Sequence, residues 1–316
     1  MTDHERLGRV AVVGAGVIGS AIAAALVDRG ARVTQVSESE GLSAASRASF
    51  AWVNAHGKMP EPYRALNAEG RAWHARHGAS WFVPTGSIVD GVPDERDGYV
   101  DVDRFLAVHR ARVGATGAVV TGRVLGLGRA RTGISLEGTG VVADTVVIAA
   151  GTGTAALVGS LTSPNSRIGS ARGPRGFAVR LRAPSAAVGR VVVDRGLLLR
   201  PDHPERPDLV VAQSLAVEQR LRSRPSSADD AATIWTEMRR ELATRVGGEV
   251  RDAEPVSVHV ADRPRSADGY PVLGWVAPGV YVVLSHSGVT LALLLADLAA
   301  RDLVGDIDPR LEAYRP

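Results

Sequence analysis

The sequence predicts an α/β fold in which a Rossmann-type nucleotide-binding domain carries an inserted antiparallel sheet. Three observations predict it. A strand, a glycine turn and a helix open the chain, a second apolar strand runs into glycine in mid-chain, and short strands broken by proline and glycine fill residues 172–259. The 316 residues suffice for two domains that each bury a core.

The opening segment carries a dinucleotide fingerprint. Residues 10–13 are apolar and predict a buried parallel strand. Gly14 permits a tight turn, Gly16 lets a pyrophosphate approach the backbone, and Gly19 lets the next helix pack on the sheet. Gly30 is placed to end that helix. A diphosphate is expected on the free N–H groups at the positive end of the helix.

The second strand, residues 31–36, should end on an acid that holds the ribose hydroxyls. Ser37 stands at that place and Glu38 follows it. Either Glu38 binds the ribose one residue late, or Ser37 does so weakly, or Glu38 is only a solvated loop acid. No arginine follows directly, and this disfavours a ribose 2′-phosphate.

Composition excludes several classes of protein. The net charge is +3 with both signs interspersed, and aromatic residues make up 4%, so nucleic-acid binding is not expected. No cysteine is present, which removes disulfides, thiolate catalysis and cysteine–zinc sites, and no metal site is predicted. The apolar stretch 289–295 is too short to span a membrane. Residues 1–9 are charged and show no signal peptide, so we expect a cytoplasmic protein.

Further elements follow in order. The apolar strand 141–148 comes after short strands at 118–121 and 134–136, and it runs into small residues and Gly151. Antiparallel strands are predicted at 177–181, 190–193, 197–199 and 209–211.

One helix interrupts these antiparallel strands. Ile234, Met238, Leu242 and Val246 repeat every four residues, and Ser227 can cap the helix. Two more strands, 271–273 and 280–284, precede a nearly all-apolar helix at 289–303. That helix should be buried against the first domain.

The C-terminal third carries two further motifs, Arg263 to Gly274 and Tyr281 to Thr290. With the glycine turn and the strand ending at Gly151, this order of motifs resembles the flavin-dependent amine oxidases, the superfamily of D-amino acid oxidase, glycine oxidase and sarcosine oxidase. The segment 46–58, paired with His-Ser-Gly-Val-Thr at 286–290, resembles a short bacterial subgroup.

The resemblance implies bound FAD and a small-molecule amine or amino acid substrate. The C–N bond would be oxidised by hydride transfer to flavin N5, which gives an imine that hydrolyses. Oxygen or another electron acceptor would then reoxidise the flavin.

The resemblance also divides the chain into an FAD-binding domain and a shortened substrate domain. The FAD-binding domain is expected over residues 1–79, 98–170 and 261–316, and the substrate domain over 80–97 and 171–260. Relatives usually carry a helical stretch after the segment matching 81–90, whereas here Asp97 follows almost at once. We therefore expect a more open site, which would admit a larger substrate or a partner subunit.

Matching the family motifs residue by residue assigns a set of positions to the cofactor. They are Gly14, Gly16, Val17, Ile18, Gly19, Ser37, Glu38, Ser43, Ser46, Arg47, Val124, Ala150, Gly151, Ser287, Gly288, Val289 and Thr290. The turn at 288–290 would aim the last helix at the N1 edge of the flavin, where reduced flavin is negatively charged. Alternatively, these residues only start the last helix and have no contact with a cofactor.

Four side chains are candidates for catalysis. The arginine at the position of Arg263 often binds the substrate carboxylate in the family; otherwise Arg263 only pins its loop. His286 either faces the substrate or packs at the strand end. Lys58, the only lysine, and His56 are candidates for the N5 side of the flavin, where they would assist oxygen reactivity or bind substrate. Lys58 could equally be a surface residue.

Two other classes of function stay open. A flavoprotein subunit with little activity alone would fit the shortened substrate domain and Ser37. An NAD(P)-dependent dehydrogenase would use only the first fingerprint, and it leaves residues 263–290 without a role.

Overall fold

The computed structural model describes residues 7–39, 43–163, 166–222, 227 and 229–316. Its central sheet orders six strands as β18-β19-β12-β1-β2-β8. All are parallel except β18, which pairs antiparallel with β19. The bounds are β1 Arg9–Val13, β2 Arg32–Ser37, β8 Ala118–Thr121, β12 Thr145–Ile148, β18 Val272–Ala277 and β19 Val280–Leu284.

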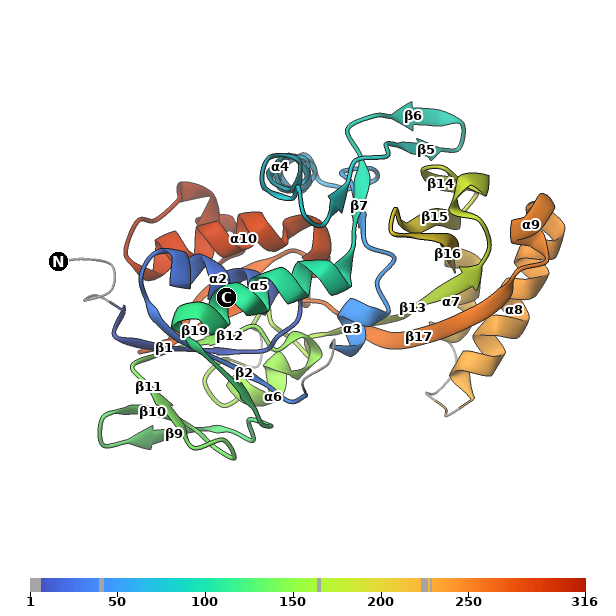
Figure 1. Ribbon diagram of the computed structural model, residues 1–316. Coiled ribbons are helices and arrows are strands. Elements are labelled where there is room, and N and C mark those ends of the chain that lie inside the picture. Colours follow the sequence, from blue (N-terminus) through green and yellow to red (C-terminus); the bar gives the residue numbers. More distant parts are fainter. Residues whose placement is uncertain (1–6, 40–42, 164–165, 223–226, 228) are drawn as a thin grey trace.

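Both faces of this sheet are buried, as its continuous apolar strands predict. Val10 and Val12 face one core, and Ala11 and Val13 face the other, because side chains alternate along a strand. Helices cover the first face, and a small sheet with α6 lies on the opposite side (Figure 1). The helices are α2 Val17–Asp28, α4 Glu61–His77, α5 Val102–Thr116 and α10 Gly288–Leu303; the small sheet is β9 Leu127–Ala130, β10 Gly133–Leu136 and β11 Val141–Ala143; and α6 is Thr154–Val158.

A second large sheet lies at the other end of the molecule, in the order β17-β13-β16-β15-β14-β5-β6. In Figure 1, β13 and β17 run together from the central part of the molecule out to this sheet, with α8 beside them. The bounds are β5 Ser87–Val89, β6 Val92–Asp94, β13 Arg172–Arg182, β14 Val191–Asp194, β15 Leu197–His203, β16 Arg206–Ser214 and β17 Glu254–Pro264.

Shorter elements complete the fold. A small sheet, β3-β7-β4, lies between the two large sheets in the view of Figure 1. The bounds are α3 Ala44–Arg47, β3 Trp52–Val53, β4 Phe82–Val83, β7 Gly98–Val100, α7 Leu215–Arg222, α8 Asp230–Arg245 and α9 Gly248–Arg251, with 3₁₀ turns at Gly151–Gly153, Ser185–Ala187 and Pro309–Tyr314.

The segment between β16 and β17 contains more helices than the single one that the sequence predicts. Ile234, Met238 and Leu242 of α8 are buried as expected, whereas Val246 follows the end of the helix. The N-cap is Asp229 and not Ser227, because the Ser227 hydroxyl accepts from the Asp229 N–H before the first turn. Helices α7 and α9 accompany α8, and both are too short to show a clear apolar period.

The long apolar helix α10 packs against α2 and α4, so its predicted burial in the first part of the fold is confirmed. Along the described ranges, we find no helix that combines the length and the apolar character needed to cross a membrane.

Candidate functional site

The glycine turn after β1 has no room for side chains. Gly14 has a φ of 115°, and a Cβ there would lie 2.3 Å from the carbonyl oxygen of Ala149. A Cβ on Gly19 would lie 2.2 Å from the carbonyl oxygen of Gly14. Gly19 thus serves the close approach of α2 to the turn itself, and its contact with the sheet is limited to Ala149 of the next strand end.

Gly16 faces two serine hydroxyls across the start of α2. A Cβ on Gly16 would lie 3.1 Å from Ser43 Oγ and 3.4 Å from Ser46 Oγ, and the two hydroxyls are 2.8 Å apart. Ser43 also caps α3 by accepting from the Ser46 N–H. Backbone N–H groups and two hydroxyls therefore surround one small space at a helix N-terminus, as an anionic phosphate group requires.

The N-termini of α2 and α10 meet. A Cβ on Gly288 would lie 3.4 Å from Ile18 Cδ1 and 3.6 Å from Val17 Cγ2. Both helices are long enough to carry a macrodipole, so two partial positive charges converge here. The structure thereby brings Val17 and Ile18 together with the segment that starts at Ser287.

Among the buried hydroxyls that have no hydrogen-bond partner within the described part of the chain, two follow strands of the central sheet. Ser285 Oγ follows β19, and Thr154 Oγ1 lies beyond the end of β12. Ligands of parallel α/β sheets bind beyond the carboxyl ends of the strands. Unsatisfied polar atoms at those ends, together with the Gly16 space, fit a polar dinucleotide.

At the ribose position, Ser37 Oγ donates a hydrogen bond of 2.7 Å to the Ser39 carbonyl. Glu38 lies 3.6 Å from Arg123 Nε, and both side chains are more than two-thirds exposed. The structure leaves both ribose interpretations open, since neither side chain is fixed in the core.

The remaining cofactor candidates follow β12, lie on the second face of the central sheet, or end α3. A Cβ on Gly151 would lie 3.3 Å from Pro264 Cγ, which joins the end of β12 to the end of β17. Ala150 and Val124 pack against the core beneath the second face of the central sheet. Arg47 is exposed at the end of α3 and is thus less enclosed than Ser46.

The loop that carries His56 and Lys58 is fixed at its start. The Trp52 indole N–H donates 3.1 Å to Asp97, a carboxylate that is 2% exposed. Asn54 Oδ1 accepts from the His56 N–H at 3.1 Å, and Gly57 has a φ of 64°, so the chain turns sharply. His56 is exposed and its ring stacks near that of Trp52.

Lys58 lies beyond this turn beside a cluster of positive charge. Burial lowers the pKa of Lys58, and the Arg263 guanidinium lowers it further. Burial lowers the pKa of His286 to about 4, helped by the charges of Lys58 and Arg263, and more weakly by Arg265 and Arg222. His286 is therefore neutral at pH 7. No described residue accepts a hydrogen bond from the Lys58 ammonium.

Arg263 is paired with a carboxylate of the chain itself. Its Nη1 donates 2.8 Å to Glu218 Oε2, and its Nη2 donates to Glu218 Oε1. Gln213 Nε2 also donates to Glu218 Oε1. Glu218 is 1% exposed and lies on α7, whereas Arg263 is on β17. The Arg263 guanidinium, which was expected to bind a substrate carboxylate, binds the carboxylate of Glu218 in this structure.

Sequence reasoning missed Glu218 and Tyr63. Glu218 lies between the buried Val217 and Leu221 of α7, and an acid on the apolar side of a helix is the signal that could have found it. Tyr63 of α4 shares a hydrogen bond of 2.6 Å with Ser287 Oγ, just before α10. No local pattern indicated that contact.

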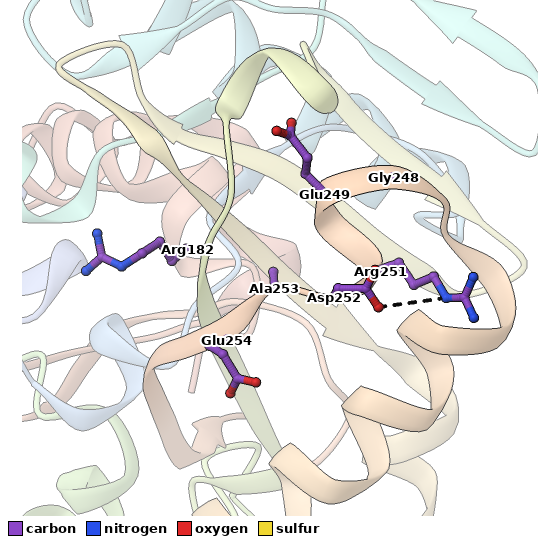
Figure 2. Close-up of a pocket in the computed structure, with 7 residues that line it drawn as sticks. All are labelled: Arg182, Gly248, Glu249, Arg251, Asp252, Ala253 and Glu254. Carbon is purple, nitrogen blue, oxygen red and sulfur yellow. Dashed lines mark ion pairs between the residues drawn. The ribbon is translucent and has the colours of Figure 1, made fainter.

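A shallow hollow of about 650 Å³ lies away from these residues. It is formed by α9, the start of β17 and the end of β13, as Figure 2 shows. The neighbouring residues Arg251 and Asp252 pair at its wall at 4.0 Å, and both are more than half exposed. Its charges are solvated, so it contributes nothing to the site between α2, α10 and Arg263.

Comparison with known proteins finds one matching family. A family described as "FAD dependent oxidoreductase" matches residues 9–89 and 79–301, which includes the segment 263–290. No curated protein matches the sequence.

Solved structures of similar fold include glycine oxidase from Geobacillus kaustophilus, with 23% identity, a TM-score of 0.75 and 95% of each chain covered. Iminodiacetate oxidase from Chelativorans sp. BNC1 has 18% identity, a TM-score of 0.75, and coverage of 98% of this chain and 99% of that one. L-amino acid deaminase from Proteus vulgaris has 15% identity, a TM-score of 0.76, and coverage of 97% and 96%.

Proposed function

Because this chain belongs to the family of FAD-dependent oxidoreductases, we propose that it oxidises the C–N bond of an amine or amino acid. It is an enzyme of the amine and amino acid oxidase type, and its cofactor is FAD. The observation that carries the proposal is the meeting of two helix N-termini beside a cluster of positive side chains.

The diphosphate of FAD would be held at the N-terminus of α2. Gly16 keeps the approach open, and the Ser43 and Ser46 hydroxyls lie within hydrogen-bonding range of that space. The N-terminus of α10 would stabilise negative charge on the ring, by about 0.3–1 kcal/mol for an exposed site and more in a buried one.

The chemistry that FAD supplies when bound is acceptance of a hydride at N5 from the carbon beside the amine, which leaves an imine for water to hydrolyse. The side chains around Arg263 prepare the substrate for this. Positive charge on Lys58 and Arg265 disfavours a substrate ammonium and so favours the free amine. The carbon beside a free amine can then lose a hydride.

His286 would contribute an uncharged ring at the turn into α10. Its lowered pKa means that the ring is neutral at pH 7 and adds no further positive charge. An amine that reaches the site already neutral needs no strong base, and this suits a histidine of low pKa.

The similar structures support a substrate of this kind. They are named for the oxidation of glycine and iminodiacetate and the deamination of L-amino acids, all of which are amines with an acidic group. We extend that class to this chain as a proposal.

An absorption spectrum followed by anaerobic addition of amines and amino acids tests the function. Flavin bands should appear and should bleach with one class of compound. Flavin bands that no amine or amino acid bleaches would contradict the proposed oxidation.

The electron acceptor is a separate part of the proposal. After bleaching, admission of oxygen should restore the flavin bands within seconds if the enzyme is an oxidase. Slow return with oxygen and fast return with a quinone would identify a dehydrogenase. Turnover by the purified single chain would exclude the need for a partner subunit.

A further inference from the structure

The carboxylate-binding fork of Arg263 is occupied by Glu218. Two nitrogens of the guanidinium meet the two oxygens of the carboxylate, which is the bidentate geometry of a strong pair. Gln213 donates a third hydrogen bond to the same carboxylate. Both carboxylate oxygens of Glu218 thus accept hydrogen bonds from within the protein, and both terminal nitrogens of Arg263 donate to them.

Gly176 of β13 leaves room for the Arg263 side chain of this pair. Arg263 lies directly over Gly176 of β13, where a Cβ would come within 2.6 Å of the guanidinium Cζ. Glu218 is 1% exposed, so with the fold intact its charge depends on protein partners rather than on water. A substrate carboxylate that took Arg263 would leave Glu218 charged, buried and short of its partner, a change that is strongly unfavourable.

Lys58 is a cation that remains available in this cluster, and it is more enclosed than the exposed Arg265. It is partly buried, it lies near enough to Arg263 and His286 to interact with their charges, and no described side chain accepts its hydrogen bonds. The loop before it is held by Trp52 on Asp97, and the Met59 carbonyl after it accepts a hydrogen bond of 3.5 Å from Tyr270 Oη. Its backbone is therefore positioned on both sides.

We propose that Glu218 is a built-in carboxylate that fills the fork of Arg263, and that the acidic group of the substrate is held by Lys58 instead. This rests on the proposed function, and it names the substrate as an amine with an anionic group. An ammonium acts as a point charge with three rotatable donors, so it does not select for the planar shape of a carboxylate as a guanidinium does. Glu218 is then a positioning residue that withholds Arg263 from the substrate.

Calorimetric titration of the FAD-loaded protein with benzoate tests the assignment, with benzamide as the neutral probe of the same shape. Lys58→Met should weaken benzoate binding by about tenfold or more, because one charge-assisted interaction is lost, and should leave benzamide unchanged. Glu218→Gln should tighten benzoate binding by about tenfold or more, since it releases the fork of Arg263.

The double variant Glu218→Gln/Arg263→Gln removes both charges of the pair together, so it decides the question even if Glu218→Gln alone does not fold. It should keep the benzoate affinity of the wild-type protein to within about threefold, well under one charge-assisted hydrogen bond. A loss of about tenfold or more in the double variant would show that Arg263 binds the anion, and would overturn the proposal.

Glu249→Gln, at the distant hollow of Figure 2, is the matched control and should change nothing. Unchanged benzoate binding in Lys58→Met, or no measurable binding to the wild-type protein, would also overturn the assignment. The bleaching experiment fails or succeeds independently, because benzoate is not oxidised and its binding is read as heat.

Discussion

His74 donates its Nε2 proton to the carbonyl oxygen of Val289, at a distance of 2.8 Å. This contact fixes α4 against the first turn of α10, next to the segment assigned to the flavin. His74 has no exposed surface, and its Nδ1 has no partner among the described residues. Burial lowers the pKa of His74 to about 4, opposed by the Val289 hydrogen bond. Burial therefore keeps the ring neutral at pH 7, and the hydrogen bond to Val289 places its one proton on Nε2.

We expect this histidine to make the fold sensitive to acid. Its pKa is lower in the folded state than in the unfolded state, so the stabilisation is complete above the unfolded value and is lost as the pH falls towards 4. Between pH 7 and pH 5 the loss should be about 2 kcal/mol from this group.

Urea unfolding of His74→Gln at the two pH values measures that loss. The Gln amide can still donate to Val289 but does not titrate, so the pH dependence of the free energy of unfolding should shrink by about that amount. The exposed His77→Gln is the control. Equal pH dependence in wild type and His74→Gln would contradict the prediction.

Gly16→Val should abolish retention of FAD. The added side chain would enter the space bounded by Ser43 and Ser46, where even a Cβ lies 3.1 Å from a hydroxyl. Flavin absorbance after gel filtration measures the loss. Gly114→Ala is the control, because a Cβ at Gly114 has no atom within 4 Å. Full flavin content in Gly16→Val would place the diphosphate elsewhere.

Gly176→Ala should displace Arg263 from Glu218, since the new Cβ would collide with the guanidinium. Loss of one partner leaves a buried charge, so the free energy of unfolding should fall by about 3 kcal/mol. Adding Glu218→Gln should recover part of that loss. Gly247→Ala, which meets nothing within 4 Å, is the control. Equal stability of Gly176→Ala and wild type in chemical denaturation would refute this packing.

Arg315→Met should destabilise the edge of the central sheet. Arg315 donates to both oxygens of Asp302, which is 5% exposed and also accepts 2.7 Å from Tyr281 Oη. Removing one partner of such a pair costs about 3 kcal/mol. Thermal and urea unfolding measure the change. Arg240→Met, an exposed helix pair with Glu237, should cost under about 1 kcal/mol. Similar losses of stability in the two variants would contradict the larger contribution that we assign to the buried Arg315–Asp302 pair.

The sequence predicted the nucleotide-binding half well because its signals are local. The strand, turn and helix around Gly14, Gly16 and Gly19 occupy the consecutive residues 9–28, and backbone sterics decide them. The family resemblance and FAD are confirmed. Helix α4 and its contacts with α10 were not anticipated, because the apolar face of α4 is weak and includes the polar residues Asn67, Arg71 and His74.

The residue assignments at the site depend on contacts between distant segments, and they stay predictions. Glu218 and Arg263 are 45 positions apart, and Tyr63 and Ser287 are 224 apart. No sequence period reports such pairs. Composition and spacing could suggest a carboxylate for Arg263, but not that the chain supplies it.

By itself, then, the sequence determined the fold class and the place of the glycine turn, because both follow from steric and apolar patterns over short distances. It indicated FAD through the resemblance of its motifs to a known family. Only the tertiary structure decided which charges face each other around Arg263. Burial removes water from Glu218, and a buried charge is fixed by whichever partner the fold brings to it.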